Sequence, residues 1–304
     1  MLVRIAADRV EIQAPAKINL FLEILAKRPD GYHEIETLMS PIGLYDSLSF
    51  CPTESPEIRL DTRWAAGSDV FHSGEVCSLG DLPPAEKNIV HRAASLLQQR
   101  SGCARGAAIR LVKRIPSAAG LGGASSDAAS VLVAANIAWQ LNFSRERLAE
   151  LAAELGSDIP FFLGSGSAIC RGRGERIENV GPIHLQVVVV RPPVGLSTPQ
   201  VYQRCRPAST PVCVQKLQSG LRSGNWKEIR SALVNRLEEP AALLTPWIGR
   251  LRKEFENAGC IAQQMSGSGS SYFGICENAR HARRVASRLR SMRVGLVTAT
   301  TTIR

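Results

Sequence analysis

Apolar and polar residues alternate most regularly over residues 16–25 of the chain. The even positions of this segment are all apolar, whereas the odd positions include Lys17, Asn19 and Glu23. A period of two predicts a strand with the even positions in the core and with Lys17 and Asn19 together on the opposite face. A second extended segment is expected from Gly31 to about Ile42, where the alternation is poorer.

The next part of the chain mixes turn signals with one helix and one strand. Residues 62–87 are rich in Gly, Pro, Ser and Asp, which predicts a loop that makes an excursion over the surface. Asn88 predicts the N-cap of a helix that ends near Arg100, and residues 107–114 predict a strand.

A buried helix is expected after a loop of small residues at 116–124. Residues 125–139 are apolar nearly all round, as in a helix covered on every side. Ser144 predicts the N-cap of the following helix, which ends at Gly156.

The second half of the chain, from about Gly164, has its own strands and helices. Four consecutive valines at 187–190 suit a strand buried on both faces. The expected elements are a strand at 185–190, helices over 212–257, strands at 261–265 and 272–276, a helix capped by Asn278 and a strand at 294–300.

Composition limits the class of protein. The chain has 304 residues, of which 44% are hydrophobic and 21% charged, as in a globular protein rather than a disordered, collagen-like or coiled-coil one. This length favours two domains. No run approaches the ~18 apolar residues of a membrane span. The first ten residues contain Arg4, Asp8 and Arg9 and lack the apolar segment of a secretory signal.

Cysteine and charge narrow the classes further. The eight cysteines form no CxxC pair and have no histidines at ligand spacing, so we expect reduced thiols in a cytoplasmic protein. The formal net charge is +10: residues 1–152 hold 16 basic and 17 acidic side chains, and residues 153–304 hold 21 and 10. This excess indicates either an anionic partner or a solubilising surface.

The strongest chemical signal is the run of small residues from Pro116 to Asp127, between a strand and a buried helix. Glycines let backbone N–H groups approach a phosphate, and a helix N-terminus adds partial positive charge. Ser125 and Ser126 are candidates for binding phosphate or a divalent cation. The run is neither a Walker A loop nor a GxGxxG fingerprint. The alternative is a tight turn with a serine N-cap.

Three weaker signals accompany it. Asp158, in Gly156-Ser-Asp-Ile-Pro160, is either a helix cap or a carboxylate that accepts a proton from a substrate hydroxyl. Lys17 and Asn19 are either a solvated strand face or part of a site. Residues 266–271 are either a hairpin turn or a second loop that faces phosphate.

These segments together resemble the GHMP kinases. Residues 116–127 are similar to the nucleotide-binding motif of that superfamily, Pro15-Ala-Lys17-Ile-Asn19-Leu to its first motif and Met265-Ser-Gly-Ser-Gly269-Ser to its third. Ala124 stands where the family commonly has glycine. The resemblance implies an α+β fold with an ATP-binding domain at 1–164, a second domain at 165–304 and the active site in the cleft between them.

The segments Asp30-Gly-Tyr32-His33-Glu and Gly156-Ser-Asp158-Ile-Pro160-Phe-Phe narrow the resemblance. They are similar to the branch that transfers the γ-phosphate of ATP to the 2-hydroxyl of a cytidine-diphosphate-linked methylerythritol, in the non-mevalonate isoprenoid pathway. This implies ATP and Mg²⁺ as cofactors, Asp158 as catalytic base and Lys17 as its supporting cation. The implied ATP-binding residues are Pro116, Ser117, Ala118, Ala119, Gly120, Leu121, Gly122, Gly123, Ala124, Ser125 and Ser126.

The same resemblance assigns the substrate side of the site. Asn19 would hold the region of the reacting hydroxyl, His33 would bond the cytosine, and Tyr32 and Tyr202 would contact it on either side. Without the resemblance, the preferred interpretation is that the histidine is hydrogen-bonded within the protein and that the tyrosines are ordinary packed side chains. No basic residue of the second half is assigned to the site, so its surplus arginine is expected to be surface, with some long-range steering of anionic ligands.

Two alternatives remain open. The first is another GHMP kinase, of mevalonate or homoserine type, although those substrates have no nucleobase for Tyr32, His33 and Tyr202. The second is a nucleic-acid-binding protein, suggested by the arginine-rich helix at 280–293. Its arginines are not interleaved with aromatic residues, and only 5% of the chain is aromatic. We therefore expect a small-molecule substrate and no nucleic-acid or membrane partner.

Overall fold

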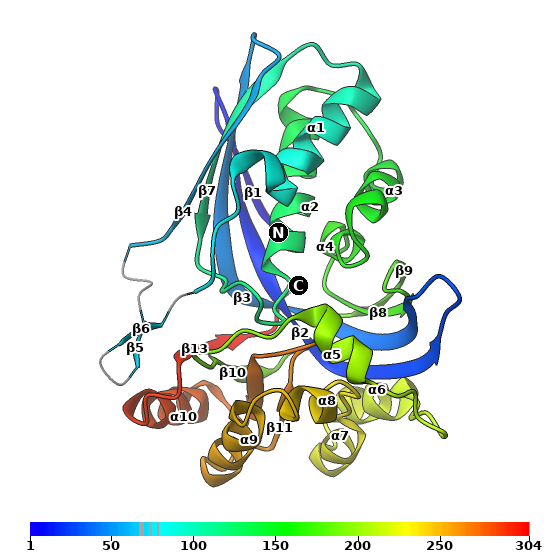
Figure 1. Ribbon diagram of the computed structural model, residues 1–304, viewed down its shortest axis with the longest axis vertical. Helices are drawn as coiled ribbons and strands as arrows, with labels where there is room; N and C mark the ends of the chain where they lie inside the picture. Colours follow the sequence, from blue (N-terminus) through cyan, green and yellow to red (C-terminus); the bar gives the residue numbers. More distant parts are fainter. Residues whose placement is uncertain (67–69, 73–74, 78, 304) are drawn as a thin grey trace.

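Two β-sheets, each covered by helices, make up the chain. The computed structural model describes residues 1–66, 70–72, 75–77 and 79–303. The first sheet and its helices form the upper layer in Figure 1, and the second sheet and its helices form the lower layer. This is the α+β architecture expected from the sequence.

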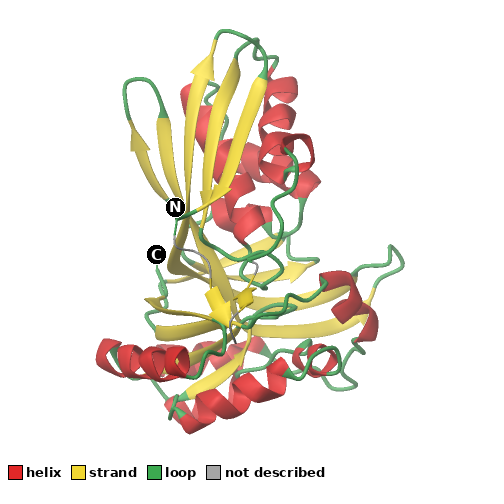
Figure 2. Cartoon of the chain, turned by 60° about the vertical axis from the view of Figure 1, so that its left-hand side comes forward, coloured by secondary structure: helices red, strands yellow, loops and turns green. Residues whose placement is uncertain are grey.

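The first sheet has seven strands, and its helices lie on one face of it (Figure 2). The strand order is β1-β2-β3-β7-β4, and β8 and β9 extend the sheet from β3. The elements are β1 (Leu2–Ile5), β2 (Val10–Lys27), β3 (His33–Thr53), β4 (Ile58–Trp64), β7 (Gly106–Lys113), β8 (Ser167–Gly172), β9 (Arg176–Gly181), α1 (Ile89–Ser101), α2 (Gly123–Ala138), α3 (Arg145–Leu155) and α4 (Ile159–Leu163).

The second sheet has four strands in the order β11-β12-β10-β13. The valine-rich strand β10 is hydrogen-bonded on both sides, and Val187–Val190 are buried, as their sequence predicts. The elements are β10 (Gln186–Arg191), β11 (Ala262–Met265), β12 (Tyr272–Cys276), β13 (Leu296–Thr301), α5 (Thr198–Arg204), α6 (Val214–Ser223), α7 (Trp226–Ala232), α8 (Glu238–Ala242), α9 (Trp247–Asn257) and α10 (Ala279–Ser291).

Strands β2 and β3 are longer than predicted and run through both layers. They pair antiparallel from Val10 opposite Phe50 to Lys27 opposite His33, with register shifts beside Asn19. The sequence placed Lys17 and Asn19 on one face, and that is confirmed. The alternative of a solvated strand face is wrong, because Lys17 is 4% exposed and Asn19 is 3% exposed.

The two layers share contacts through β2 and β3. Leu22 bridges to Asn235, and Ile42 bridges to Thr302 near the end of the chain. The fully buried Glu23 on β2 accepts two hydrogen bonds from Arg236, both 2.7 Å. A bidentate carboxylate–guanidinium pair fixes orientation as well as distance. These contacts hold the second layer against the first.

A division of the chain at residue 164 would cut β8 and β9 away from their own sheet. Both strands lie after Gly164, yet β8 pairs with β3 and β9 pairs with β8. The second sheet begins only at β10. We therefore propose a domain boundary after β9, near residue 182, in place of the boundary between 164 and 165.

The described part of residues 62–87 contains more secondary structure than the loop expected from its composition. Strand β4 continues to Trp64, β5 (Val70–His72) pairs with β6 (Glu75–Cys77), and a short helical turn η1 (Ala85–Lys87) precedes α1. Figure 1 shows the β5–β6 hairpin projecting from the molecule, as a surface excursion should. Gly67 and Gly74, on which the expectation partly rested, lie outside the described residues.

Two features are absent from the residues that the structure describes, a membrane-spanning helix and a metal-binding cluster. No helix there is long and apolar enough to cross a membrane. No group of three metal-ligating side chains occurs there either. The cysteines whose side chains are described are free thiols, four of them buried.

Candidate active site

A cleft of about 920 Å³ lies where the two layers meet. Its walls include β2, β3, the loop before α2, the start of α4, the β8–β9 turn, α5 and the β11–β12 turn. All the site residues predicted from the sequence line it except Ser126. Segments far apart in the chain therefore meet at one place, between the two sheets.

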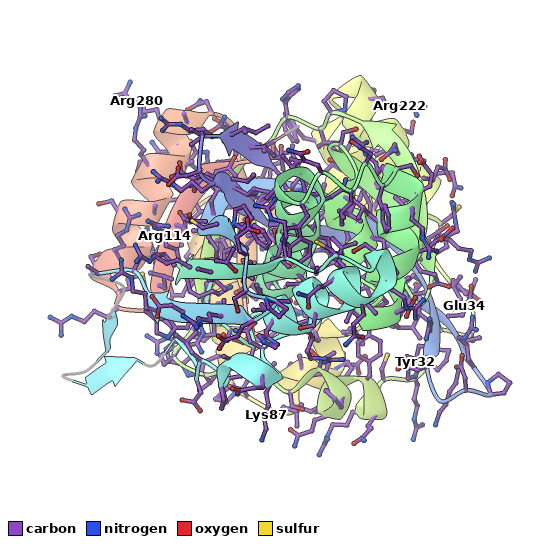
Figure 3. All side chains as sticks on the ribbon, turned by 90° about the horizontal axis from the view of Figure 1, so that it is seen from above. Tyr32, Glu34, Lys87, Arg114, Arg222 and Arg280 are labelled. Carbon is purple, nitrogen blue, oxygen red and sulfur yellow. The ribbon has the colours of Figure 1, made fainter. Side chains whose placement is uncertain are left out.

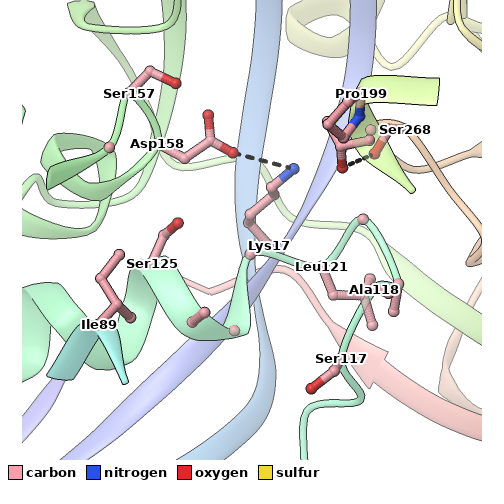
Figure 4. A pocket seen from close by; sticks show the side chains of 18 of the residues that line it. Lys17, Ile89, Ser117, Ala118, Leu121, Ser125, Ser157, Asp158, Pro199 and Ser268 are labelled. Atoms are coloured by element: carbon pink, nitrogen blue, oxygen red, sulfur yellow. Dashed lines mark hydrogen bonds and ion pairs between the residues drawn. The ribbon is translucent and has the colours of Figure 1, made fainter. Parts of the chain in front are cut away.

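Lys17 and Asp158 face each other across this cleft (Figure 4). The Lys17 Nζ lies 3.9 Å from the Asp158 Oδ2. The lysine is 4% exposed, and burial lowers its pKa despite the opposing effect of Asp158. Asp158 stands at the N-cap of α4, but its side chain makes no capping hydrogen bond, and 38% of it is exposed. The carboxylate is thus directed to the cleft rather than to the helix.

Asn19 is oriented by a chain of hydrogen bonds. Its Oδ1 accepts from Lys17 Nζ at 2.5 Å, and its Nδ2 donates to Thr37 Oγ1 at 2.8 Å. The Thr37 hydroxyl in turn donates to the Phe21 carbonyl at 2.6 Å. Because Thr37 can only accept here, the amide oxygen of Asn19 must face the lysine. Sequence reasoning missed Thr37, since its role depends on the pairing of β2 with β3.

The loop of small residues forms the floor of the cleft. Gly120 and Gly122 have positive φ angles of 72° and 69°. A side chain at Gly120 would lie 2.1 Å from the Ser266 carbonyl oxygen, so glycine is required there. Helix α2 begins at Gly123, two residues earlier than predicted, with Gly122 as N-cap. The alternative of a serine N-cap is therefore wrong, and both serines lie in the first helical turn.

The two serines differ in position. Ser125 lines the cleft, whereas Ser126 is fully buried beneath it, and its hydroxyl has no hydrogen-bond partner among the described residues. Of the two serines, therefore, only Ser125 has a side chain placed to meet a ligand in the cleft.

The β11–β12 turn closes the cleft from the second layer. The Ser266 hydroxyl donates to the Gly120 carbonyl at 3.0 Å and accepts from the Asn19 N–H at 3.2 Å. Gly267 has a φ of 55°, and a Cβ there would lie 3.1 Å from Asn19 Oδ1 and 3.3 Å from Lys17 Nζ, so a side chain would be strained and tightly packed. The Thr198 and Ser268 hydroxyls are 2.8 Å apart (Figure 4). The segment is therefore a hairpin turn, and through Ser266 it also contacts the loop of small residues at Gly120 and strand β2 at Asn19.

Aromatic side chains line the other end. The rings of His33 and Tyr202 have centroids 5.3 Å apart and are tilted by 42°. Burial and Lys27 lower the pKa of His33, which keeps the imidazole neutral near pH 7. Burial raises the pKa of Tyr202, so its hydroxyl stays protonated. Tyr32 is 55% exposed at the outer end of the β2–β3 hairpin (Figure 3).

A second lysine borders the cleft in a different setting. Lys113 donates to the carboxylates of Asp46 and Asp127, and all three are buried. Asp46 Oδ1 also accepts the backbone N–H groups of Arg114 and Ile115. This triad joins the end of β7 to the first turn of α2, the two ends of the phosphate-loop segment. No local pattern predicts this triad, because Asp46 is remote in the chain from Lys113 and Asp127.

The sequence assigns no basic residue of the second half to the site, yet the structure brings one to the cleft. Arg173, in the turn between β8 and β9, lines the cleft. The arginines of α10 fit the expected surface, because Arg283, Arg284 and Arg288 are exposed. Figure 3 shows Arg280 at the opposite edge of the molecule from Tyr32.

Family models match both halves of the chain. The GHMP kinases N terminal domain matches residues 88–169, and the GHMP kinases C terminal domain matches residues 217–294. The 4-diphosphocytidyl-2-C-methyl-D-erythritol kinase of Pelotomaculum thermopropionicum is 43% identical over 280 residues, which cover 91% of this chain and 92% of that protein. The chain belongs to the GHMP kinases. The family resemblance drawn from the sequence motifs is confirmed.

Solved structures of other proteins have a similar fold. A crystal structure of 4-(cytidine 5'-diphospho)-2C-methyl-D-erythritol kinase has 36% identity and a TM-score of 0.80, covering 97% of this chain and 99% of that one. The homoserine kinase from Cytophaga hutchinsonii has 19% identity and a TM-score of 0.74, covering 99% and 97%. The latter shows the common fold alone.

Proposed function

We propose that this GHMP kinase uses ATP to phosphorylate the 2-hydroxyl of 4-diphosphocytidyl-2-C-methyl-D-erythritol, a step of the non-mevalonate isoprenoid pathway. One observation carries the proposal: Lys17 and Asp158 face each other in a cleft that is also lined by the loop of small residues and by aromatic side chains. The relatives of 35–43% identity that carry this enzyme's name support the choice of substrate.

The transfer step needs a base beside the attacking hydroxyl. We assign this role to Asp158, whose partly exposed carboxylate is free to accept the proton. The hydroxyl oxygen forms a bond to the γ-phosphorus as the bond to the bridging oxygen of ADP breaks, and the proton passes to Asp158. The Lys17 cation keeps the carboxylate ionised and stabilises charge on the transferring group. Asn19 holds the lysine from the other side.

Phosphate binding rests on backbone and helix geometry. The loop from Pro116 to Gly122 presents its backbone to the cleft, and the N-terminus of α2 adds partial positive charge. We assign Mg²⁺ to Ser125, which lines the cleft, together with the phosphates of ATP, because Mg²⁺ takes oxygen ligands and keeps few of them from protein. The cation would neutralise the charge of the β- and γ-phosphates.

The aromatic end selects the substrate. A cytosine offers a flat face and a hydrogen-bonding edge, which suit Tyr32, Tyr202 and the neutral His33. Mevalonate and homoserine would leave this end of the cleft unfilled. The nucleic-acid alternative is not favoured, because the arginines of α10 lie away from the cleft and cover a buried apolar face.

A substrate panel tests the proposal. ADP release would be measured with 4-diphosphocytidyl-2-C-methyl-D-erythritol, mevalonate and homoserine at equal concentrations. We expect release with the first alone, with the phosphate found on the 2-hydroxyl by nuclear magnetic resonance. Faster release with mevalonate or homoserine would contradict the proposed function.

A further inference from the structure

The turn between β8 and β9 lies between the two ends of the substrate cleft. Strand β8 pairs with β3 so that Gly172 is opposite Ile35, two residues from His33. On its other side the turn approaches the proposed base, because a Cβ on Gly174 would lie 3.4 Å from the Asp158 Oδ1. Arg173 stands between these two glycines. Its position is therefore between the aromatic pocket and the reacting hydroxyl.

The Arg173 side chain differs from the other arginines of this hairpin. Arg171 pairs with Glu36 and Glu178, and Arg176 pairs with Glu34. Arg173 has no carboxylate within ion-pair distance in the part of the chain that the structure describes. Its guanidinium carbon instead lies 5.0 Å from the centre of the Tyr32 ring. Packing on an aromatic ring leaves the N–H groups at the guanidinium edge available.

The two buried lysines of the cleft are already engaged by groups of the protein. Lys17 binds Asn19 and faces Asp158, and Lys113 is held between two carboxylates. A substrate that spans from Tyr32 to Asp158 must place its diphosphate between them. This group carries at least two negative charges that need a partner. A planar guanidinium suits two phosphate oxygens at once.

We infer that Arg173 binds the diphosphate of the substrate and so helps to select a nucleoside-diphosphate substrate. The inference rests on the proposed function. It also gives the basic second half of the chain a part in the site. Arg173 acts in binding rather than in the transfer step, because the Lys17–Asp158 pair lies at the reacting end.

Equilibrium binding separates this role from simple support of Tyr32. The probes are CDP and cytidine, added to protein saturated with a non-hydrolysable ATP analogue so that the ATP site is filled. In Arg173→Ala we expect CDP to bind about 10- to 100-fold more weakly, as for loss of a charged hydrogen bond, while cytidine changes less than about threefold. Arg173→Lys should recover part of the loss, because it keeps the charge without the planar fork.

Arg176→Ala is the matched control, since it removes the same charge from the same hairpin outside the cleft. It should change neither affinity. Equal losses of CDP and cytidine in Arg173→Ala, or an equal effect of Arg176→Ala, would overturn the inference.

Turnover adds a second readout. Arg173→Ala should raise the KM for 4-diphosphocytidyl-2-C-methyl-D-erythritol by the same factor as the CDP affinity falls, with kcat and the KM for ATP within about twofold of wild type. A fall in kcat with unchanged KM would contradict a binding role. Failure of the proposed function would appear separately, as wild-type protein that releases no ADP with this substrate.

Discussion

Lys17 and Lys113 are two buried lysines of one cleft with opposite electrostatic surroundings. They are 4% and 6% exposed, and both lie on strands of the first sheet. Burial lowers the pKa of Lys17, whereas the pKa of Lys113 is raised because Asp127 and Asp46 outweigh the effect of its burial. Similar burial thus gives opposite shifts of the lysine pKa, and the distance from the lysine to nearby carboxylates decides the direction.

We propose that this difference separates a catalytic lysine, Lys17, from a structural one, Lys113. The nearest carboxylate oxygen to Lys17 is 3.9 Å away and partly exposed, so its cation is still free to interact with a phosphoryl group. Lys113 donates to two buried carboxylates at once and connects the strand before the phosphate loop to the helix after it. Changes at the first site should affect turnover, and changes at the second should affect stability.

The largest expected effect is on turnover in Asp158→Asn. An amide cannot accept the proton, so kcat should fall by about 100- to 10,000-fold, the range for loss of a general base. The unfolding free energy should change little, because the Asp158 carboxylate makes no capping hydrogen bond. ADP release measures kcat, and urea unfolding measures the unfolding free energy. A stable variant with full kcat would refute the role of Asp158.

The largest expected effect on stability is in Lys113→Met. Removing the cation leaves Asp46 and Asp127 buried without it, which should cost about 3–5 kcal/mol of unfolding free energy. Arg110→Met is the control, because Arg110 is an exposed cation on the same strand. If both variants unfold at the same urea concentration, the triad does not stabilise the loop ends.

A pH-dependent effect is expected from Asp127. Burial and the Asp46 charge raise its pKa to about 7, despite the attraction of Lys113. Protonation of Asp127 therefore favours the folded chain. This contribution is complete below the ordinary aspartate pKa of 3.8 and is lost as pH rises through about 7.

Asp127→Asn should remove that pH dependence. Relative to the variant, wild-type protein should lose on the order of a few kcal/mol between pH 4 and pH 8. Urea unfolding of both proteins across this range measures the difference. Parallel stability curves would show that Asp127 titrates normally.

The smallest expected effect is in Thr37→Val. Valine removes the acceptor that fixes the Asn19 amide, so that kcat should fall about three- to tenfold, as for loss of one hydrogen bond of about 1 kcal/mol. Thr37→Ser keeps the hydroxyl and should retain the wild-type rate. Equal rates in the valine and serine variants would show that Asn19 is oriented by other contacts.

The sequence predicted those features that depend on local pattern. The alternation over β2 placed Lys17 and Asn19 on one face, and the small residues at 116–124 predicted the loop before a buried helix. The two caps Asn88 and Ser144 are as predicted, because a side chain that bonds its own helix needs no distant partner.

The remaining features depend on long-range pairing. Thr37 meets Asn19 only through the register of β2 with β3, which shifts beside Asn19. Arg173 reaches the cleft because β8 adds to β3, and Asp46 meets Lys113 across β3 and β7. A local sequence pattern cannot predict contacts between residues that are far apart in the chain. The roles of Asp158, Tyr32, His33 and Tyr202 came from family resemblance and remain predictions.

The contrast between the two lysines is tested most directly by Lys17→Met, measured for both turnover and urea unfolding. Met is similar in length and has no charge to bury, so the unfolding free energy should stay within about 1 kcal/mol of wild type or rise. The rate of ADP release should fall at least about 100-fold, as for loss of an electrostatic catalytic group. A variant that keeps its rate, or that loses as much stability as Lys113→Met, would contradict the account.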